Sequence, residues 1–187
     1  MQGSRAITNE EINELLKVAS PRDRLLILTG ITFGTRISES LELTFKDVDG
    51  ATLRLKSKKG SFNQEFPIPR GYNIAMNAMK KYYQENGIEV TPDTHLFLSV
   101  RSETYRGKVM TSQNANSTIR LLAKRIKAEG KVSCHSMRKA FVTRIYEKTE
   151  FNIAATQKYS RHKSLNNLQY YISTTDSMEL VNDELWG

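Results

Sequence analysis

The sequence of 187 residues has very few cysteines and no long apolar segment. Its one cysteine, Cys134, can form neither an internal disulfide nor a thiolate zinc cage, so we expect a reducing, cytoplasmic compartment. The longest apolar runs, such as Leu25–Leu28, are far shorter than the roughly 18 residues of a membrane span, so we expect no membrane partner. The first residues, Met1–Arg5, include no apolar segment of the kind found in signal peptides.

Acidic residues are fewer than basic ones. The chain has 28 Lys and Arg against 20 Asp and Glu, a formal net charge of +8. Lys and Arg gain affinity for a phosphate backbone by releasing its condensed counterions, so this surplus favours nucleic acid as the partner. The alternative is a charge that serves solubility alone. A hydrophobic content of 39% excludes wholesale disorder.

Capping residues and apolar spacing predict a mostly helical chain. Thr8 and Glu11 form a capping box at the start of one helix, and Pro21 suits the first position of the next. This second helix is apolar on most sides and should be central, and Gly34 ends it. The sequence predicts helices at about 8–18, 21–33, 36–41, 72–85, 111–129, 135–148, 152–159 and 164–172, with an amphipathic segment at 177–187.

Strand patterns are confined to one region. Residues 51–56 alternate between apolar and polar side chains, and 63–68 can pair with them across a turn at 58–61. The chain contains no repeat and no low-complexity linker. The sequence therefore predicts a single domain, mostly α with a small antiparallel β-sheet (α+β).

Four residues are candidates for phosphate chemistry on their own merits. Arg36 lies between two apolar helices, so its guanidinium should be partly buried and need an anion, either a ligand or Glu39 one turn later. His135 and Arg138 are three apart on one helix face, a pairing that suits an oxygen gaining charge in a transition state, although chance also produces such a pair. Lys59 in the hairpin turn can protonate a leaving oxygen, or simply be a charged turn residue.

Tyr171 follows His162 by nine residues, and the intervening turn can bring phenol and imidazole together. A tyrosine with a pKa near 10 becomes a nucleophile when cations stabilise the product and an imidazole takes its proton. The alternative is that Tyr170 and Tyr171 are ordinary packing residues.

The order and spacing of these residues resemble the tyrosine recombinase (phage integrase) family. Gly34–Leu41 is similar to the family's first arginine box, Gly-x-Arg-(Ile/Val)-Ser-Glu, and His135–Lys139 to its His-x-Leu-Arg box. Lys59 precedes Pro67 by the spacing that separates the family's hairpin lysine from its proline. The nine-residue spacing of the last box selects Tyr171 over Tyr170, and the resemblance covers about residues 8–172.

The resemblance implies the catalytic-domain fold of these enzymes and DNA strand exchange without metal, ATP or another cofactor. Tyr171 would attack a backbone phosphate and form a 3′-phosphotyrosine, while Arg36 and Arg138 grip the nonbridging oxygens. His135 would assist proton transfer, His162 would hydrogen-bond the phosphate, and a hairpin lysine, Lys59 or its neighbour Lys58, would protonate the leaving 5′-oxygen.

The resemblance also implies partners and domain boundaries. The partner would be double-stranded DNA, with self-association, as a tetramer on DNA, and accessory DNA-bending proteins as further possibilities. Residues 1–7 would be a leader, 8–172 the catalytic core, and 173–187 a C-terminal tail that docks in trans or on its own body. We expect the family's N-terminal core-binding domain to be absent from this chain, as in either a catalytic fragment or a naturally short member that inverts DNA.

Departures from the family pattern leave alternatives open. Arg161 stands where the family has a glycine before the last histidine, so we expect a different local path there or an extra phosphate contact. A type IB topoisomerase, a catalytically silent DNA-binding regulator and a basic interaction module are the other readings. Six residues are thus candidates for catalysis: Arg36, Lys59, His135, Arg138, His162 and Tyr171. Other basic residues are candidates for contacts with the DNA backbone: Arg22, Arg24, Lys80, Lys81, Arg101, Arg106, Lys108, Lys124, Arg125, Lys127 and Lys131.

Overall fold

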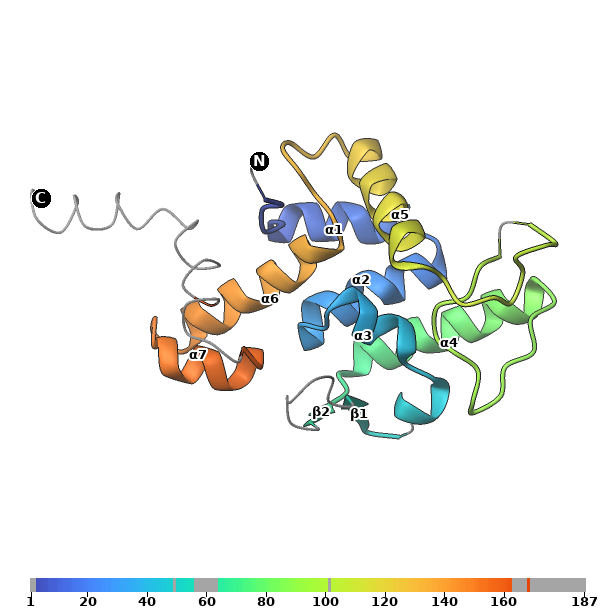
Figure 1. Ribbon diagram of the computed structural model, residues 1–187, viewed down its shortest axis with the longest axis horizontal. Helices are drawn as coiled ribbons and strands as arrows, with labels where there is room; N and C mark the ends of the chain where they lie inside the picture. Colours follow the sequence, from blue (N-terminus) through green and yellow to red (C-terminus); the bar gives the residue numbers. More distant parts are fainter. Residues whose placement is uncertain (1–2, 49, 56–63, 101, 163–167, 169–187) are drawn as a thin grey trace, which may run out of the picture.

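A computed structural model of the chain describes residues 3–48, 50–55, 64–100, 102–162 and 168. Its elements follow one another along the chain as α1 (Asn9–Val18), α2 (Pro21–Phe33), α3 (Ile37–Glu42), the short 3₁₀ helix η1 (Phe45–Val48), β1 (Thr52–Leu55), β2 (Gln64–Pro67), α4 (Arg70–Glu85), α5 (Ser112–Arg125), α6 (Cys134–Lys148) and α7 (Ile153–Ser160). Among the described residues the helices pack together, and the small two-stranded sheet lies at one edge of the molecule (Figure 1). The predicted fold class, mostly α with a small antiparallel sheet, is confirmed.

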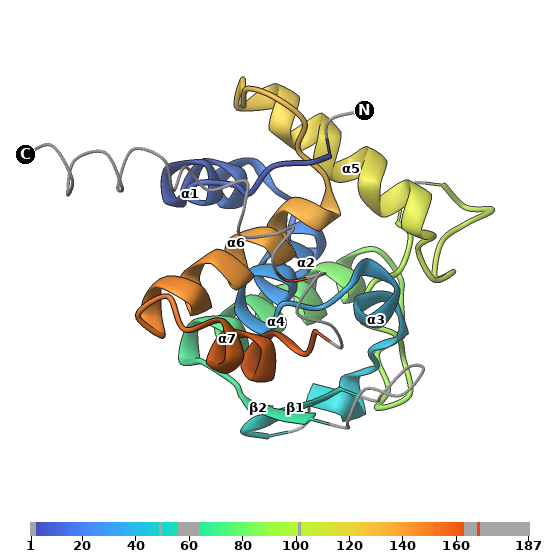
Figure 2. The same cartoon turned by 60° about the vertical axis from the view of Figure 1, so that its left-hand side comes forward.

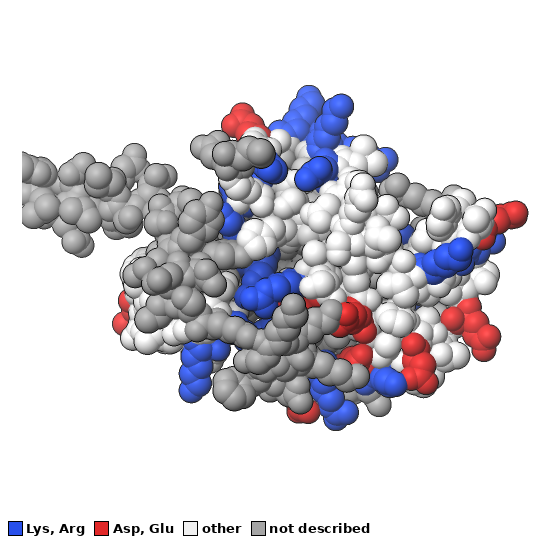
Figure 3. Space-filling view, viewed as in Figure 1, with Lys and Arg blue, Asp and Glu red and all other residues white. Residues whose placement is uncertain are grey.

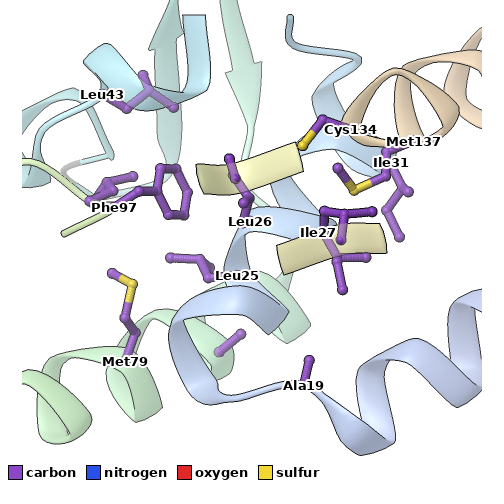
Figure 4. Packing of buried hydrophobic residues seen from close by; sticks show 14 of the residues in the cluster. Ala19, Leu25, Leu26, Ile27, Ile31, Leu43, Met79, Phe97, Cys134 and Met137 are labelled. Carbon is purple, nitrogen blue, oxygen red and sulfur yellow. The ribbon is translucent and has the colours of Figure 1, made fainter. Parts of the chain in front are cut away.

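Helix α2 occupies the centre of the helical layer. It contacts α1, α3, α4 and α6, and both views show it between α4 and α6 (Figures 1 and 2). Leu25, Leu26 and Ile27 are fully buried. Leu25 lies on the side of Phe97 and Met79, whereas Ile27 lies on the other side, beside Ile31 and Met137 (Figure 4). A helix that is apolar on most sides can only be stable when covered on most sides, which explains this central position.

The helix ends form where the sequence predicts them. Thr8 caps α1 through a capping box with Glu11, and Ser20 caps α2, with Pro21 as its first residue. Gly34 ends α2 in the left-handed conformation, with φ +59°. A Cβ at Gly34 would collide with the ring of Phe141 on α6, so both the backbone and the packing require glycine here.

The sheet is a hairpin of β1 and β2. The strands pair in antiparallel register, with Leu53 opposite Phe66 and Arg54 opposite Glu65, whose side chains form an ion pair. This confirms the predicted pairing of 51–56 with 63–68. The turn between the strands, which contains Lys58 and Lys59, lies outside the described residues.

The connection between α4 and α5 is long but anchored in the core. Leu96, Phe97 and Leu98 are buried. The hydroxyl of Tyr83 donates to the carbonyl of Leu96 (2.7 Å) and accepts from the amide of Leu98 (2.8 Å). These bonds satisfy buried backbone groups that would otherwise lack partners. The Tyr83 side chain thus provides the hydrogen bonds that a neighbouring strand would provide in a sheet.

Two helix boundaries and one short helix differ from the prediction. Helix α5 ends at Arg125 rather than near 129, because Lys127 takes the left-handed conformation with φ +55°. Helix α4 begins at Arg70, two residues early, and η1 was not predicted. The predicted helix at 164–172 lies outside the described residues except for Leu168, which is helical and buried.

The close approach of α2 and α6 at Gly34 makes a stability prediction. We expect Gly34→Ala to lower the free energy of unfolding by about 2–4 kcal/mol, because it adds left-handed strain and overpacks the Phe141 ring. Gly71→Ala, in the first turn of α4 with open space around it, should be neutral or slightly stabilising. Urea denaturation of both variants tests this. An equal effect of the two substitutions would contradict the packing argument.

Candidate functional site

Four of the six predicted site residues lie among the described residues. Arg36 is at the start of α3, His135 and Arg138 are on α6, and His162 follows the end of α7. We call these four the Arg–His cluster. Helix α6 contacts both α2 and α7, and α2 contacts α3, so three distant segments of the chain meet here. Lys59, its alternative Lys58, and Tyr171 lie outside the described residues.

Arg138 is the most deeply buried member, with 1% of its surface exposed. Its Nη1 donates to the carbonyl of Gly34 at the end of α2. Its Nη2 donates to the carbonyl of Ser160 at the end of α7 (3.0 Å) and lies 3.3 Å from Nε2 of His162. A buried guanidinium is costly unless such acceptors surround it. Arg138 therefore joins the ends of two helices and fixes its own position.

His162 is buried directly beside this guanidinium. An arginine can only donate, so Nε2 of His162 accepts from Arg138, and Nδ1 carries the proton and donates to the hydroxyl of Ser160 (2.7 Å). Burial, followed by the positive charges of Arg138, Arg36 and Arg161, lowers the pKa of His162 to about 3. The imidazole is therefore neutral at neutral pH.

His135 lies in the first turn of α6, where Ser133 caps the helix by accepting from the His135 amide (3.2 Å). Its outer edge is exposed to solvent, one helical turn from Arg138. Partial desolvation and the charges of Lys139, Arg138 and Arg36 lower its pKa. A second neutral imidazole is thus available to accept a proton.

Arg36 forms the ion pair with Glu39 that the sequence suggested. Its Nη1 lies 3.0 Å from Oε1 of Glu39, and its amide donates to Oε2 (2.7 Å). The guanidinium is partly buried as expected, since 47% of the Arg36 side chain is exposed, whereas only 6% of Glu39 is. The carboxylate is the buried partner, and the cation remains accessible to an anion from solvent.

Arg161 differs from what its sequence position led us to expect. It ends α7 with φ +58°, the left-handed conformation that glycine adopts most easily at a helix end, so the junction is tight and the expected different path is wrong. Its guanidinium is buried and donates to Oε2 of Glu39 (3.1 Å). It also lies 5.7 Å from the ring centre of Phe66. The side chain thus points into the protein, toward Glu39, rather than toward a phosphate in solvent.

The charged groups around the cluster include more cations than anions. Burial alone would raise the pKa of Glu39, but Arg161, the Arg36 amide, and the charges of Arg36 and Arg138 hold it below its ordinary value. One carboxylate therefore stands among three guanidinium groups. Such an excess of fixed donors suits an anion with several oxygens, as a phosphodiester is.

The candidate backbone contacts are distributed unevenly. Arg22 does not fit, because it is 3% exposed, pairs with Asp23 and donates to the carbonyl of Leu98 (3.0 Å). Arg24 donates to the carbonyl of Leu16 (2.9 Å), and Arg101 lies outside the described residues. On the face shown in Figure 3, basic side chains gather along the upper edge over α5, whose last turn carries Lys124 and Arg125.

Two features are absent from the part of the chain that the structure describes. In that part of the chain, no group of three or more His, Cys, Asp or Glu side chains is arranged to hold a metal ion. None of the described helices has the length and apolar character of a membrane span.

Sequence comparisons relate the chain to known proteins. The model of the phage integrase family matches residues 5–178. Tyrosine recombinase XerA of Thermococcus kodakarensis is 29% identical over 176 residues, covering 91% of this chain and 58% of the relative. Tyrosine recombinase XerD of Halalkalibacterium halodurans is 25% identical over 185 residues, with the same coverage. The chain thus spans little more than half the length of the curated relatives it matches.

Solved structures show the same fold. The crystal structure of XerA recombinase superposes with a TM-score of 0.75 at 20% identity, covering 100% of this chain and 67% of that one. XerH site-specific recombinase, bound to its palindromic difH substrate in a post-cleavage complex, gives a TM-score of 0.72 at 20% identity, covering 98% and 53%.

The neutral state of His162 makes a prediction about pH. An unfolded histidine binds a proton below about pH 6.5, whereas native His162 does so only near pH 3, so the unfolded state binds more protons between these values. Stability should therefore fall as the pH decreases from 6.5, with a slope from this residue that approaches about 1.4 kcal/mol per pH unit. Urea denaturation between pH 7 and 5 measures the slope, which should be smaller in His162→Asn.

Nitrogen NMR of the His162 imidazole measures its protonation state and tautomer directly. We expect the neutral form with the proton on Nδ1 at pH 5. A doubly protonated ring at pH 6, or identical pH slopes for the wild type and His162→Asn, would contradict the assignment.

Proposed function

Because the chain belongs to the phage integrase family, we propose that it is a site-specific DNA recombinase that acts through a 3′-phosphotyrosine intermediate. The family match over residues 5–178 supports the class of activity. The observation that carries the proposal is the Arg–His cluster, whose four residues come from three distant segments of the chain. Its two guanidinium groups help to lower the pKa values of its two imidazoles, which are therefore neutral. The chain covers 58% of the length of the Thermococcus kodakarensis relative, so the proposal concerns the chemistry of the part that the two proteins share.

The proposed first step is a transesterification. The phenol oxygen of Tyr171 attacks the phosphorus of a DNA backbone phosphate, and the bond from phosphorus to the 5′-oxygen breaks. His135, neutral because its pKa is lowered, accepts the phenol proton, while Lys59 or Lys58 gives a proton to the leaving oxygen. The new phosphotyrosine bond retains the energy of the broken one, so a 5′-hydroxyl from a partner duplex can attack it without ATP or a metal.

The arginines would stabilise the charge that the phosphate gains. Arg36 is accessible and offers a planar fork of donors that lysine cannot reproduce. Arg138 is held from behind by two carbonyls, and because it is 1% exposed, a phosphate reaches it only after neighbouring atoms give way. A phosphate beside His162 would raise the pKa of its imidazole and so allow Nε2 to donate to a phosphate oxygen.

The same proposal extends to partners and boundaries. Residues 8–172 would form the catalytic core, after a leader at 1–7, and 173–187 a tail that docks in trans when the protein assembles as a tetramer on double-stranded DNA. Accessory DNA-bending proteins would assist where the target must bend. The site of action would be the cytoplasm, where prokaryotic or phage DNA is found.

Covalent trapping tests the nucleophile. A duplex selected from random sequences for binding is nicked near the cleavage point, so that the product diffuses away and the adduct accumulates on a denaturing gel. We expect Tyr171→Phe to abolish the adduct while duplex binding is retained, because only the attacking oxygen is lost. The neighbouring Tyr170→Phe serves as the matched control and should form adduct at the wild-type rate.

The outcomes of this experiment separate the competing functions. Adduct formation by Tyr171→Phe would exclude Tyr171 as the nucleophile. Binding without any adduct from the wild type would favour a silent regulator. An adduct accompanied by relaxation of a supercoiled plasmid, with no exchange between two sites, would favour a type IB topoisomerase.

Truncation tests the proposed role of the tail. Removing the residues after Thr175 should lower the oligomeric state on DNA without changing the monomer's fold, because a segment docked in trans stabilises only the assembly. Size-exclusion chromatography with light scattering on the bound duplex measures this. An unchanged assembly would show that the tail docks on its own body or not at all.

A further inference from the structure

Arg161 is buried, charged and absent from the proposed mechanism. It ends α7 immediately before His162, and only 6% of its side chain is exposed. A residue with φ +58° costs free energy unless it is glycine. Both the backbone conformation of Arg161 and the burial of its charge are unfavourable for folding. The contacts of its side chain must compensate for this free energy.

The contacts of Arg161 lead to Arg36 through one carboxylate. Nη2 of Arg161 donates to Oε2 of Glu39 (3.1 Å), and Oε2 also accepts from the Arg36 amide (2.7 Å). Oε1 of the same carboxylate accepts from Nη1 of Arg36 (3.0 Å). Glu39 thus divides its hydrogen bonds between two guanidinium groups, one buried and one exposed.

This division changes what Arg36 can offer a ligand. A buried carboxylate with a single cationic partner would hold that partner tightly and neutralise its charge. Arg161 takes part of the negative charge of Glu39 and anchors Oε2, so Arg36 keeps both its orientation and a net positive field. The exposed half of the Arg36 guanidinium is then available to an anion.

The other face of Arg161 contacts the hairpin. Its guanidinium lies 5.7 Å from the ring centre of Phe66 on β2, a cation–π distance. Phe66 pairs with Leu53 of β1, and its ring lies 5.8 Å from that of Phe33 at the end of α2. One side chain therefore touches the strand leading from the lysine-bearing turn and the carboxylate that orients the first arginine.

We propose that Arg161 is a positioning residue that holds Glu39 so that Arg36 faces the phosphate, and that links the end of α7 to the hairpin; this rests on the proposed recombinase function. The effect reaches the reaction through Arg36 and not through contact with DNA. It is distinct from a solvent-facing phosphate contact, which would act on binding.

Arg161→Gly isolates the side chain. Glycine accepts φ +58° without strain, so the backbone path is retained while both contacts are lost. We expect the rate of covalent adduct formation at saturating nicked duplex to fall roughly tenfold, within the range of coupling between residues of one network, with duplex affinity nearly unchanged. Arg161→Lys, which keeps the charge but not the planar fork, should recover part of the rate.

Two controls distinguish positioning from a loss of charge or of fold. Lys158→Ala removes an exposed cation from the same helix and should leave the rate at saturation unchanged. In a double-mutant cycle, Arg161→Gly should cost little once Arg36 has been replaced by lysine, since the fork it orients is gone. A purely structural role would give equal losses in both backgrounds.

The outcomes are separable from those of the proposed function. Adduct formation by the wild type and by Arg161→Gly at the same saturating rate would overturn this inference alone. Additive losses in the cycle, or a loss confined to duplex affinity, would do the same. No adduct from the wild type would overturn the recombinase proposal, and the inference with it.

Discussion

The buried guanidinium of Arg138 is the group on which the geometry of the site depends, because its donors join segments that the chain otherwise separates. It donates to the carbonyl of Gly34 at the end of α2 and to that of Ser160 at the end of α7. Both carbonyls are available because their helices end there. Gly34 presents its carbonyl from a left-handed turn that no side chain would fit, since Phe141 lies against it. The two acceptors that hold Arg138 thus come from the ends of helices α2 and α7.

Burial and the neighbouring charges determine which groups of the site are ionised and which are neutral. Positive charges and burial keep His135 and His162 neutral, while Glu39 stays ionised among three guanidinium groups. The result is a set of fixed cations together with imidazoles that can accept protons. That combination favours an anionic substrate whose reaction releases and consumes protons, as phosphodiester transesterification does.

Much of this was predictable from local sequence signals. The capping box at Thr8, the break at Gly34 and the alternating strands depend on neighbours within a few residues, and all three formed as expected. The common face of His135 and Arg138 follows from helical spacing alone. Local signals failed where a distant contact decides. The burial of Arg161 depends on Glu39 and on how α3, α7 and β2 meet. Helix α5 ends at Arg125, and the left-handed residue that follows is Lys127, so no glycine indicated this end in the sequence.

The most direct measurement is a crystal structure of the Tyr171→Phe variant bound to a duplex that carries its cleavage site. The account predicts one backbone phosphate with its nonbridging oxygens about 3 Å from the guanidinium groups of Arg36 and Arg138, and His162 within hydrogen-bond reach. Arg138 would still donate to the carbonyls of Gly34 and Ser160. A phosphate bound away from these groups, or an Arg138 released from both carbonyls, would contradict it.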